Sequence, residues 1–206
     1  KQTTPKYRRL LAAAAVASLG VSASQAALDY RFYGDFLALF PDDAIAGVDY
    51  QALLDDANFP DDPVIVDLHP AAAFYFTDES TSLETSGFIE CPQDGPGATL
   101  TGDTGSDNYG AAVSGIFYPQ VTGTYRFHVR SDDSSALFFN PEGPEFLDPK
   151  TATPVATESD CCDPFELTGE TVSDPFELVA GEGYAMEFIW KEGGGGDWAQ
   201  LGWSLN

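Results

Sequence analysis

The stretch GTYRFHVRSDDSSALFF, residues 123–139, carries the strongest evidence for the fold. In its first half, Tyr125, Phe127 and Val129 alternate with polar residues, which is the period of a β-strand with one face in a core. Its second half ends in an apolar run, residues 136–139, that is typical of another strand. A polar segment, residues 131–135, separates the two. The stretch therefore predicts two successive core strands joined by a polar connection.

The same alternation of apolar and polar residues recurs at residues 28–32, 183–190 and 200–205, and predicts half-buried strands of antiparallel sheets. Glycine-containing turns separate these segments. Residues 49–57 alone have the pattern of a short helix, with Asp49 as its N-cap. Two polar stretches, residues 91–108 and 140–173, are expected to be long loop insertions. These features predict an all-β fold, an antiparallel β-sandwich with long loop insertions.

Two adjacent acids, Asp132 and Asp133, lie in the connection between the two strands of the opening stretch. Neighbouring carboxylates that are poorly solvated repel each other, and a bound cation would relieve this. On a regular strand, adjacent side chains point to opposite faces, so both carboxylates can bind one ion only if the backbone is distorted, for example by a cis peptide. Calcium, which takes six to eight oxygen ligands, fits such a pair.

The second candidate for a binding site is the string KEGGGGDW, residues 191–198, between two predicted strands. Four glycines next to an acid are typical of a flexible loop with accessible carbonyl oxygens. The string is not a phosphate-binding loop, because no Gly-Lys-Ser/Thr follows. The alternative is a plain hairpin connection with one surface acid. Trp198 belongs either to the core or to a platform on which a sugar stacks.

The charge of the chain excludes several partners. It has 33 acidic and nine basic residues and a net charge of −24, which disfavours nucleic acid and anionic membranes. Residues 1–26 have the basic start, apolar centre and small-residue end of a signal peptide, and residues 27–206 form one domain by length. We therefore expect a secreted protein, extracellular or at the cell surface, that is not inserted in the membrane. Because the chain starts without Met, we also expect it to be part of a longer protein with other domains.

The sequence gives no sign of catalysis or of a zinc site. It has no Gly-x-Ser-x-Gly elbow, and no pair of acids stands out as the acid and base of a glycosidase. His128 is expected at the surface. The three cysteines, Cys91, Cys161 and Cys162, have no Cys-x-x-Cys spacing and are disulfide candidates in an exported chain. The expected bridge joins Cys91 to one of the adjacent pair, and a vicinal bridge with Cys91 free is the alternative.

Several strings together resemble one family: residues 123–127, the pair Asp132 and Asp133, residues 176–190, and Trp203, with residues 108–110 and 113–115. They resemble the family named after the N-terminal domain of anthrax protective antigen, a β-sandwich module that also occurs in yeast flocculin-type adhesins and bacterial glycosidases. The resemblance covers residues 28–206. The strings at residues 158–162 and 191–197 resemble a bacterial branch found in large secreted proteins.

The resemblance implies a site and a function. In the adhesins, two consecutive aspartates joined by a cis peptide bind calcium, which in turn coordinates sugar hydroxyls. It implies Asp132, Asp133 and Asp197 as calcium ligands, with Asp197 standing where the adhesins have asparagine. The ligand-binding residues of the same loop would be Glu192, Gly195, Gly196 and Trp198. The expected function is a calcium-dependent carbohydrate-binding, lectin-like module for adhesion or substrate targeting. The alternative is a non-catalytic structural or protein-interaction domain with a structural calcium site.

Overall fold

The computed structural model describes residues 28–34, 43–69, 86–90, 107–161, 165–194 and 198–205 of the 206-residue chain. For residues 28, 30, 65–69, 86–90 and 198, the description concerns the backbone alone. The predicted signal peptide lies outside the described residues, as do Cys91, Cys162, Gly195, Gly196 and Asp197. The prediction that residues 1–26 are removed and that residues 27–206 form one domain stays a prediction.

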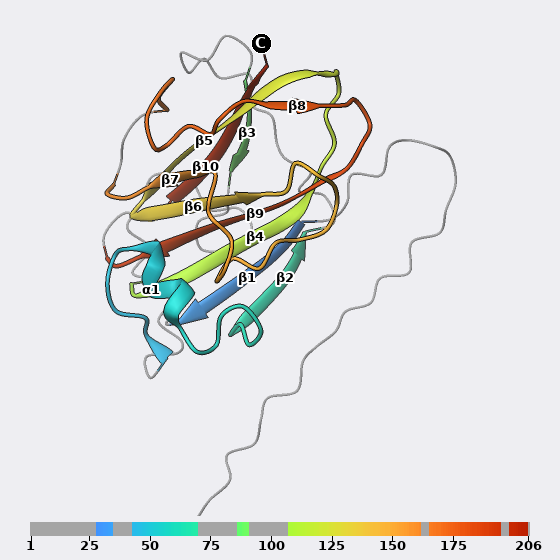
Figure 1. Cartoon of the computed structure of the whole chain (residues 1–206). Helices are drawn as coiled ribbons and strands as arrows, with labels where there is room; N and C mark the ends of the chain where they lie inside the picture. The colour runs from blue at the N-terminus through green and yellow to red at the C-terminus, as the bar shows by residue number, and fades with distance from the viewer. Residues whose placement is uncertain are drawn as a thin grey trace, which may run out of the picture.

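Two antiparallel sheets form the frame of the molecule (Figure 1). Their strands are β1 (Leu28–Gly34), β2 (Ile65–His69), β3 (Ser86–Glu90), β4 (Tyr109–Phe117), β5 (Gly123–Asp132), β6 (Ser134–Phe139), β7 (Ala156–Glu158), β8 (Phe176–Leu178), β9 (Tyr184–Glu192) and β10 (Trp198–Leu205). The six-stranded sheet has the order β2-β1-β4-β9-β6-β7, and the four-stranded sheet has the order β3-β10-β5-β8. The predicted antiparallel β-sandwich is confirmed.

The main core lies between the two sheets and is largely aromatic. The alternating residues that predicted β5 all point into it: Tyr125 and Phe127 are each 1% exposed, and Val129 is fully buried. Rings from the other sheet meet them, with Phe127 and Phe139 4.6 Å apart between centroids. Each such ring removes a large apolar area from water, which is the main term that stabilises the sandwich.

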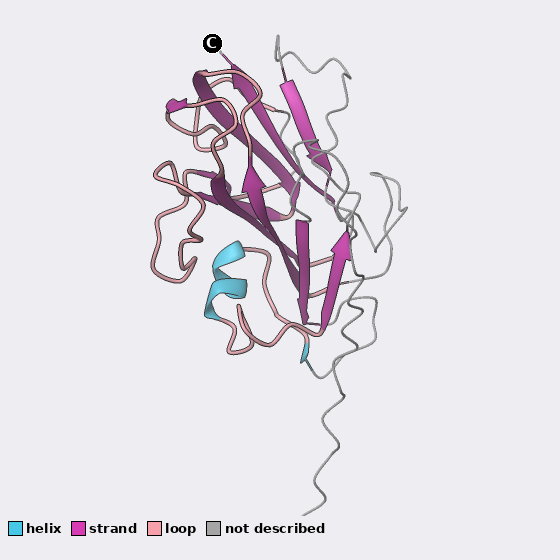
Figure 2. Cartoon of the chain, turned by 90° about the vertical axis from the view of Figure 1, so that its right-hand side faces the viewer, coloured by secondary structure: helices cyan, strands magenta, loops and turns pink. Residues whose placement is uncertain are grey.

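A third layer covers the outer face of the six-stranded sheet. Helix α1 (Tyr50–Asp55) is capped by Asp49, whose carboxylate accepts a bond from the Gln51 N–H, so the predicted short helix and its N-cap are confirmed. Leu53 and Leu54 pack against the sheet, on Ala112, Ala136, Phe138 and Ile189 among others. Figure 2 shows α1 beside the strands. In the described part of the chain, no helix is long and apolar enough to cross a bilayer.

This third layer corrects one prediction. The segment at residues 183–190 was expected to be a half-buried strand, but every residue of β9 is buried, Glu187 and Lys191 included. Its second face carries charged residues and therefore has the sequence pattern of a solvated face. In the structure, α1 and the loops around it cover that face instead.

The predicted insertion at residues 140–173 is also more ordered than expected. It contributes β7 to the six-stranded sheet and a single bridge between Val172 and His128 of β5.

His128 was expected at the surface, and this is wrong: it is 1% exposed, because residues 165–173 cover it. Its Nδ1 lies 2.9 Å from the Glu166 carbonyl oxygen and its Nε2 lies 3.0 Å from Ser204 Oγ. Burial lowers the pKa of His128.

Candidate functional site

Two passages of the chain from one sheet to the other meet at one end of the sandwich. The first passage joins β5 of the small sheet to β6 of the large sheet through Asp133. The second joins β9 of the large sheet to β10 of the small sheet through residues 193–197. Strand pairing brings the two passages together, because Trp198 pairs with Asp132 and Lys191 pairs with Ser134. The two sequence candidates, the acidic pair and the glycine string, are therefore neighbours in space.

The carboxylates of Asp132 and Asp133 converge at this end. One oxygen of each lies within 4.8 Å of the other and of Cys161 Sγ. The peptide bond between the two residues is cis, as the sequence predicts for converging adjacent side chains. Burial raises the pKa of Asp132, and repulsion from Asp133 raises it further. The pair is therefore a concentrated negative charge in a partly desolvated place.

The glycine string contacts this pair directly. The Gly193 N–H donates a hydrogen bond to Asp133 Oδ2 at 2.9 Å. A Cβ on Gly193 would come within 2.6 Å of Val48 Cγ1 and 3.1 Å of Asp133 Oδ2. Real Cβ atoms do not approach other atoms as closely as the first of these distances. A side chain at this position would therefore force Val48 or the backbone to shift, between the acidic pair and the segment that precedes α1.

Lys191 and Glu192 lie in β9, so the loop begins two residues later than the sequence pattern suggested. Both side chains are fully buried. The prediction that Glu192 takes part in ligand binding thus concerns a buried residue and stays a prediction. Lys191 Nζ donates to the Glu192 carbonyl oxygen. Burial lowers the pKa of Lys191 to about 8, although Glu192 and Asp133 attract its positive charge and act in the opposite direction. A cationic side chain thus lies near the acidic pair.

Asp107 is a residue of this region that sequence reasoning missed. Its carboxylate lies beside Gly194, such that a Cβ on Gly194 would be 3.4 Å from Asp107 Oδ1. Asp107 is exposed, and in sequence it was one acid among several in the predicted insertion at residues 91–108. Only the tertiary fold brings it to the second passage between the sheets, so the sequence offered no signal for it.

Cys161 also lies here, with its Sγ 3.2 Å from Asp132 Oδ1. It is disulfide-bonded, and its partner lies outside the described residues. Since the other cysteines are Cys91 and Cys162, the expected Cys91 pairing and its vicinal alternative both stay open. A disulfide sulfur has no thiolate to offer a metal. The metal-binding candidates of the described residues are therefore the two carboxylates alone.

Three predicted site residues, Gly195, Gly196 and Asp197, lie outside the described residues, and only the backbone of Trp198 is described. Both ends of their segment are fixed beside the acidic pair, by the Gly193 hydrogen bond and the Trp198 pairing. The roles assigned to Asp197 and to the loop glycines stay predictions.

Comparison with solved structures finds distant similarity. The A domain of epithelial adhesin 9 from Candida glabrata, in complex with Galβ1-4GlcNAc, is 17% identical, with a TM-score of 0.48, over 87% of this chain and 82% of that one. A β-glucosidase from Kluyveromyces marxianus in complex with glucose is 12% identical, with a TM-score of 0.43, over 87% of this chain. This chain spans only 15% of that enzyme. Among curated proteins, none matches.

A family model gives the assignment. The model described as the PA14 domain matches residues 101–206, slightly more than half of the chain. The matched range contains β5, β6, β9 and β10, and with them the acidic pair and the whole glycine string. The chain belongs to the PA14 domain family.

Proposed function

We propose that this chain is an extracellular, non-catalytic module that binds carbohydrate through a calcium ion held by Asp132 and Asp133. The observation that carries the proposal is the convergence of these two carboxylates with both ends of the glycine loop at one end of the sandwich. The loop would add Asp197 and glycine carbonyl oxygens from the opposite side. Membership of the PA14 family supports the proposal, because the site lies within the matched range.

The described residues fit a calcium ion in their chemistry. Carboxylate and carbonyl oxygens are the ligands that calcium prefers. The raised pKa of Asp132 reflects burial and the repulsion of Asp133, and a divalent cation would offset both. When bound, calcium would supply coordination positions that adjacent sugar hydroxyls can fill. Asp132 and Asp133 would hold the ion from the side of the sheets, and the loop would leave the outer side open.

The charge of the protein favours a neutral ligand. A chain with a net charge of −24 repels phosphates and other anions at long range. Neutral glycans do not experience this repulsion, and their hydroxyls exchange against bound water with small net gain. We therefore expect weak binding, with dissociation constants of about micromolar to millimolar. Several copies acting together would then be needed for adhesion.

Lys191 favours a second candidate, a structural or protein-interaction domain. Its ammonium is fully buried and lies close enough to Asp133 for the two charges to interact. It could compensate part of the negative charge internally, with calcium either absent or closed off by protein oxygens. The two candidates differ in whether a sugar can reach the ion.

Thermal unfolding with calcium and with chelator tests the ion. At a hundredfold excess over its dissociation constant, calcium should raise the free energy of unfolding by about 2.7 kcal/mol. Asp132→Asn and Asp133→Asn should remove this gain, whereas Asp55→Asn, at an exposed site on α1, should keep it. Equal melting temperatures with and without calcium in the unmodified chain would refute a calcium site.

A glycan array followed by calorimetry with neutral sugars separates the two candidates. The carbohydrate-binding proposal expects binding in calcium, loss of binding in chelator, and weaker binding by Asp197→Ala with an unchanged melting temperature in chelator. Because chelator and this substitution would act on the same step, their effects should not add. Stabilisation by calcium without binding of any sugar would favour the structural domain.

A further inference from the structure

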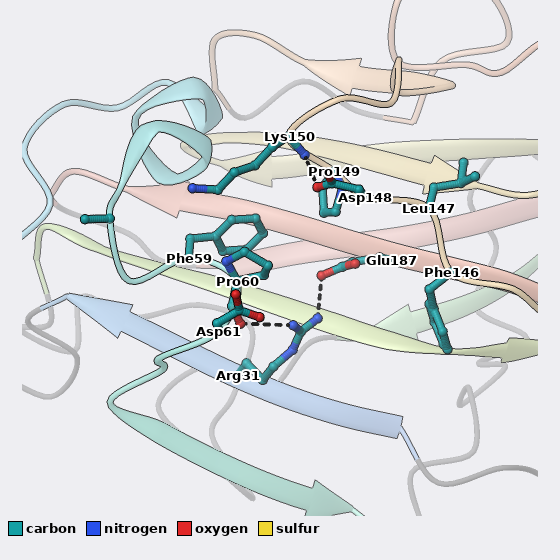
Figure 3. Close-up of a pocket in the computed structure, with 11 residues that line it drawn as sticks. Arg31, Phe59, Pro60, Asp61, Phe146, Leu147, Asp148, Pro149, Lys150 and Glu187 are labelled. Atoms are coloured by element: carbon teal, nitrogen blue, oxygen red, sulfur yellow. Dashed lines mark hydrogen bonds and ion pairs between the residues drawn. The ribbon is translucent and has the colours of Figure 1, made fainter.

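A pocket with a volume of about 600 Å³ lies on the outer face of the six-stranded sheet. One wall is formed by residues 57–61, which follow α1, and the other by residues 146–150, which follow β6 (Figure 3). Arg31 of β1 and Glu187 of β9 line it from the sheet itself. The volume is within the range of small-molecule sites in proteins.

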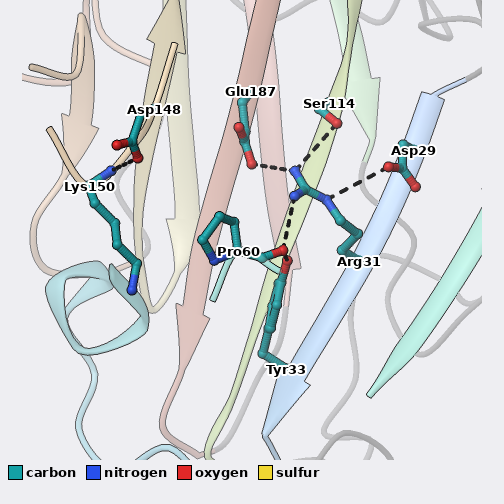
Figure 4. A network of polar contacts seen from close by, with 8 residues as sticks. All are labelled: Asp29, Arg31, Tyr33, Pro60, Ser114, Asp148, Lys150 and Glu187. Carbon is teal, nitrogen blue, oxygen red and sulfur yellow. Dashed lines mark hydrogen bonds and ion pairs between the residues drawn. The ribbon is translucent and has the colours of Figure 1, made fainter. Parts of the chain in front are cut away.

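Arg31 and Glu187 form an ion pair through Arg31 Nη2 and Glu187 Oε1 (Figure 4). Further contacts hold the guanidinium, from the Pro60 carbonyl oxygen and Ser114 Oγ, each at 3.4 Å. These two bonds are long, so the guanidinium can exchange them for better ones. Among the described residues, Glu187 hydrogen bonds to Arg31 alone, which leaves Oε2 available to accept a bond from a ligand.

Stability alone does not account for this pair. Beneath α1, the same face of the sheet is apolar, with Ala112, Ala136 and Ile189 packed there. Glu187 is 6% exposed, and burial raises its pKa despite the opposing effect of Arg31. A buried ion pair can often be replaced by apolar residues without loss of stability. A charged pair that lines a pocket is therefore a candidate for ligand binding.

The pocket is separate from the acidic pair at the sheet passages. Glu187 lies four residues before Lys191 on the same strand, which corresponds to about 13 Å along β9. The residues of the pocket belong to the six-stranded sheet and to the third layer, and not to the two passages between the sheets. Nothing in the pocket requires a metal ion.

The side chains around the pocket select the ligand class. Two cations, Arg31 and Lys150, and three acids, Glu187, Asp61 and Asp148, line it. The mixture provides donors and acceptors together, so neither an anion nor a cation matches it. Hydroxyl groups, which both donate and accept, match it well, and their bonds to charged groups are the stronger kind.

An exposed aromatic side chain also lines the pocket. Phe146 is 52% exposed, although it is a large apolar side chain. In Figure 3, it lies on one side of the ion pair, and the buried ring of Phe59 lies on the other. An exposed ring can stack on the apolar C–H face of a sugar ring, while the hydroxyls reach the charged groups. We propose that this pocket is a second saccharide site, which binds one neutral pyranose unit without calcium. It extends the proposed function to a region that the calcium site does not reach.

The test maps binding residue by residue by the amide shifts of the isotope-labelled chain. The probes are the methyl glycosides of glucose, galactose and mannose, titrated in calcium and in chelator. The expected result is a shift of the amides of Phe146, Leu147, Asp148, Lys150 and Glu187 in both conditions. Phe146→Ala should weaken this binding by about two- to tenfold. Leu167→Ala, which removes another exposed apolar side chain (62%) outside the pocket, should leave it unchanged.

The outcomes separate the two sites. Shifts confined to Asp133 and Gly194, and only in calcium, would leave the proposed function standing and overturn the second site. Shifts confined to the residues of the pocket would support the second site and overturn the proposed function at the acidic pair. Pocket shifts that Phe146→Ala leaves at full affinity would also overturn the proposal, because the exposed ring is part of it. Phe146 is exposed, so this variant should fold, and the measurement in calcium keeps the test valid if the chelated chain is unstable.

Discussion

Replacing Gly193 with alanine should disturb the acidic pair, whereas the same replacement at Gly194 should not. The two glycines are neighbours on the second passage between the sheets, and neither has a positive φ. Alanine is therefore compatible with the backbone at both positions. The difference lies in the space around them. At Gly193 the new methyl group meets Val48 at 2.6 Å and Asp133 at 3.1 Å, and at Gly194 its nearest neighbour is Asp107 at 3.4 Å.

The expected change in the free energy of unfolding depends on which groups must move to make room for the added methyl group. Val48 is 53% exposed and can turn away at low cost. The Gly47 carbonyl oxygen, 3.3 Å from the added methyl group, is backbone and moves only with its loop. If Gly193 shifts instead, its hydrogen bond to Asp133 weakens, and a bond to a charged acceptor contributes about 1.5–3 kcal/mol. We expect a loss of about 1–3 kcal/mol for Gly193→Ala. For Gly194→Ala, we expect no loss, or a gain of about 0.4–1 kcal/mol from the less flexible unfolded chain.

Urea unfolding of both variants in chelator gives these free energies without a contribution from calcium. Titration with calcium then gives the affinity of each folded variant. Gly193→Ala should bind calcium more weakly than the unmodified chain, because Asp133 loses the N–H that orients it. Equal stability and equal calcium affinity in the two variants would refute the argument that the close approach of Gly193 positions the acidic pair.

Three further predictions concern the rest of the fold. Burial lowers the pKa of His128 below its ordinary 6.5, so below pH 6.5 the unfolded chain binds a proton that the folded chain does not. The free energy of unfolding should therefore fall as the pH drops through 6.5. Urea unfolding across pH should give a shallower fall for His128→Gln, and equal slopes for the two chains would contradict this. Ile189→Ala, at a fully buried site beneath α1, should cost about 2–5 kcal/mol in the same assay, and a cost under about 1 kcal/mol would mean that the third layer is loosely packed. Peptide mapping without reduction should find Cys91 linked to Cys161 or Cys162, and a bridge between the adjacent pair would contradict it.

The alternation of apolar and polar residues predicted the strands that have one apolar face, but it did not predict which segments cover the other face. In β5, apolar residues face the core, and the pattern gave the strand and its inward face correctly. In β4, eight of the nine residues are buried, so its sequence YGAAVSGIF has no alternation to detect. The same cover hides the second face of β9, where Glu187 and Lys191 have the sequence character of solvated residues. Burial of a strand face by segments distant in sequence depends on the tertiary fold, so the alternation of residues within the strand cannot reveal it.

The acidic pair could be predicted because adjacency in sequence ensures adjacency in space. Its neighbours could be predicted only in part. The glycine string was found from its composition, and β-pairing explains why it meets Asp132. Asp107 reaches this end through the sheet order, and Lys191, although it belongs to the string, is buried by the cover over β9; neither effect leaves a local pattern. The pocket around Arg31 combines residues from β1, β9 and two loops, so the separate segments contained no motif for it.

The double passage between the sheets has a consequence for engineering. Residues 193–197 begin at a strand of one sheet and end at a strand of the other, and the pairing of Trp198 with Asp132 fixes the position of the second end. The length and composition of this short segment can therefore be exchanged while the packed sheets hold its two attachment points at a constant spacing. A library that varies residues 195–197 would sample new recognition surfaces on a rigid frame, and the acidic pair would remain as an invariant anchor beside every member.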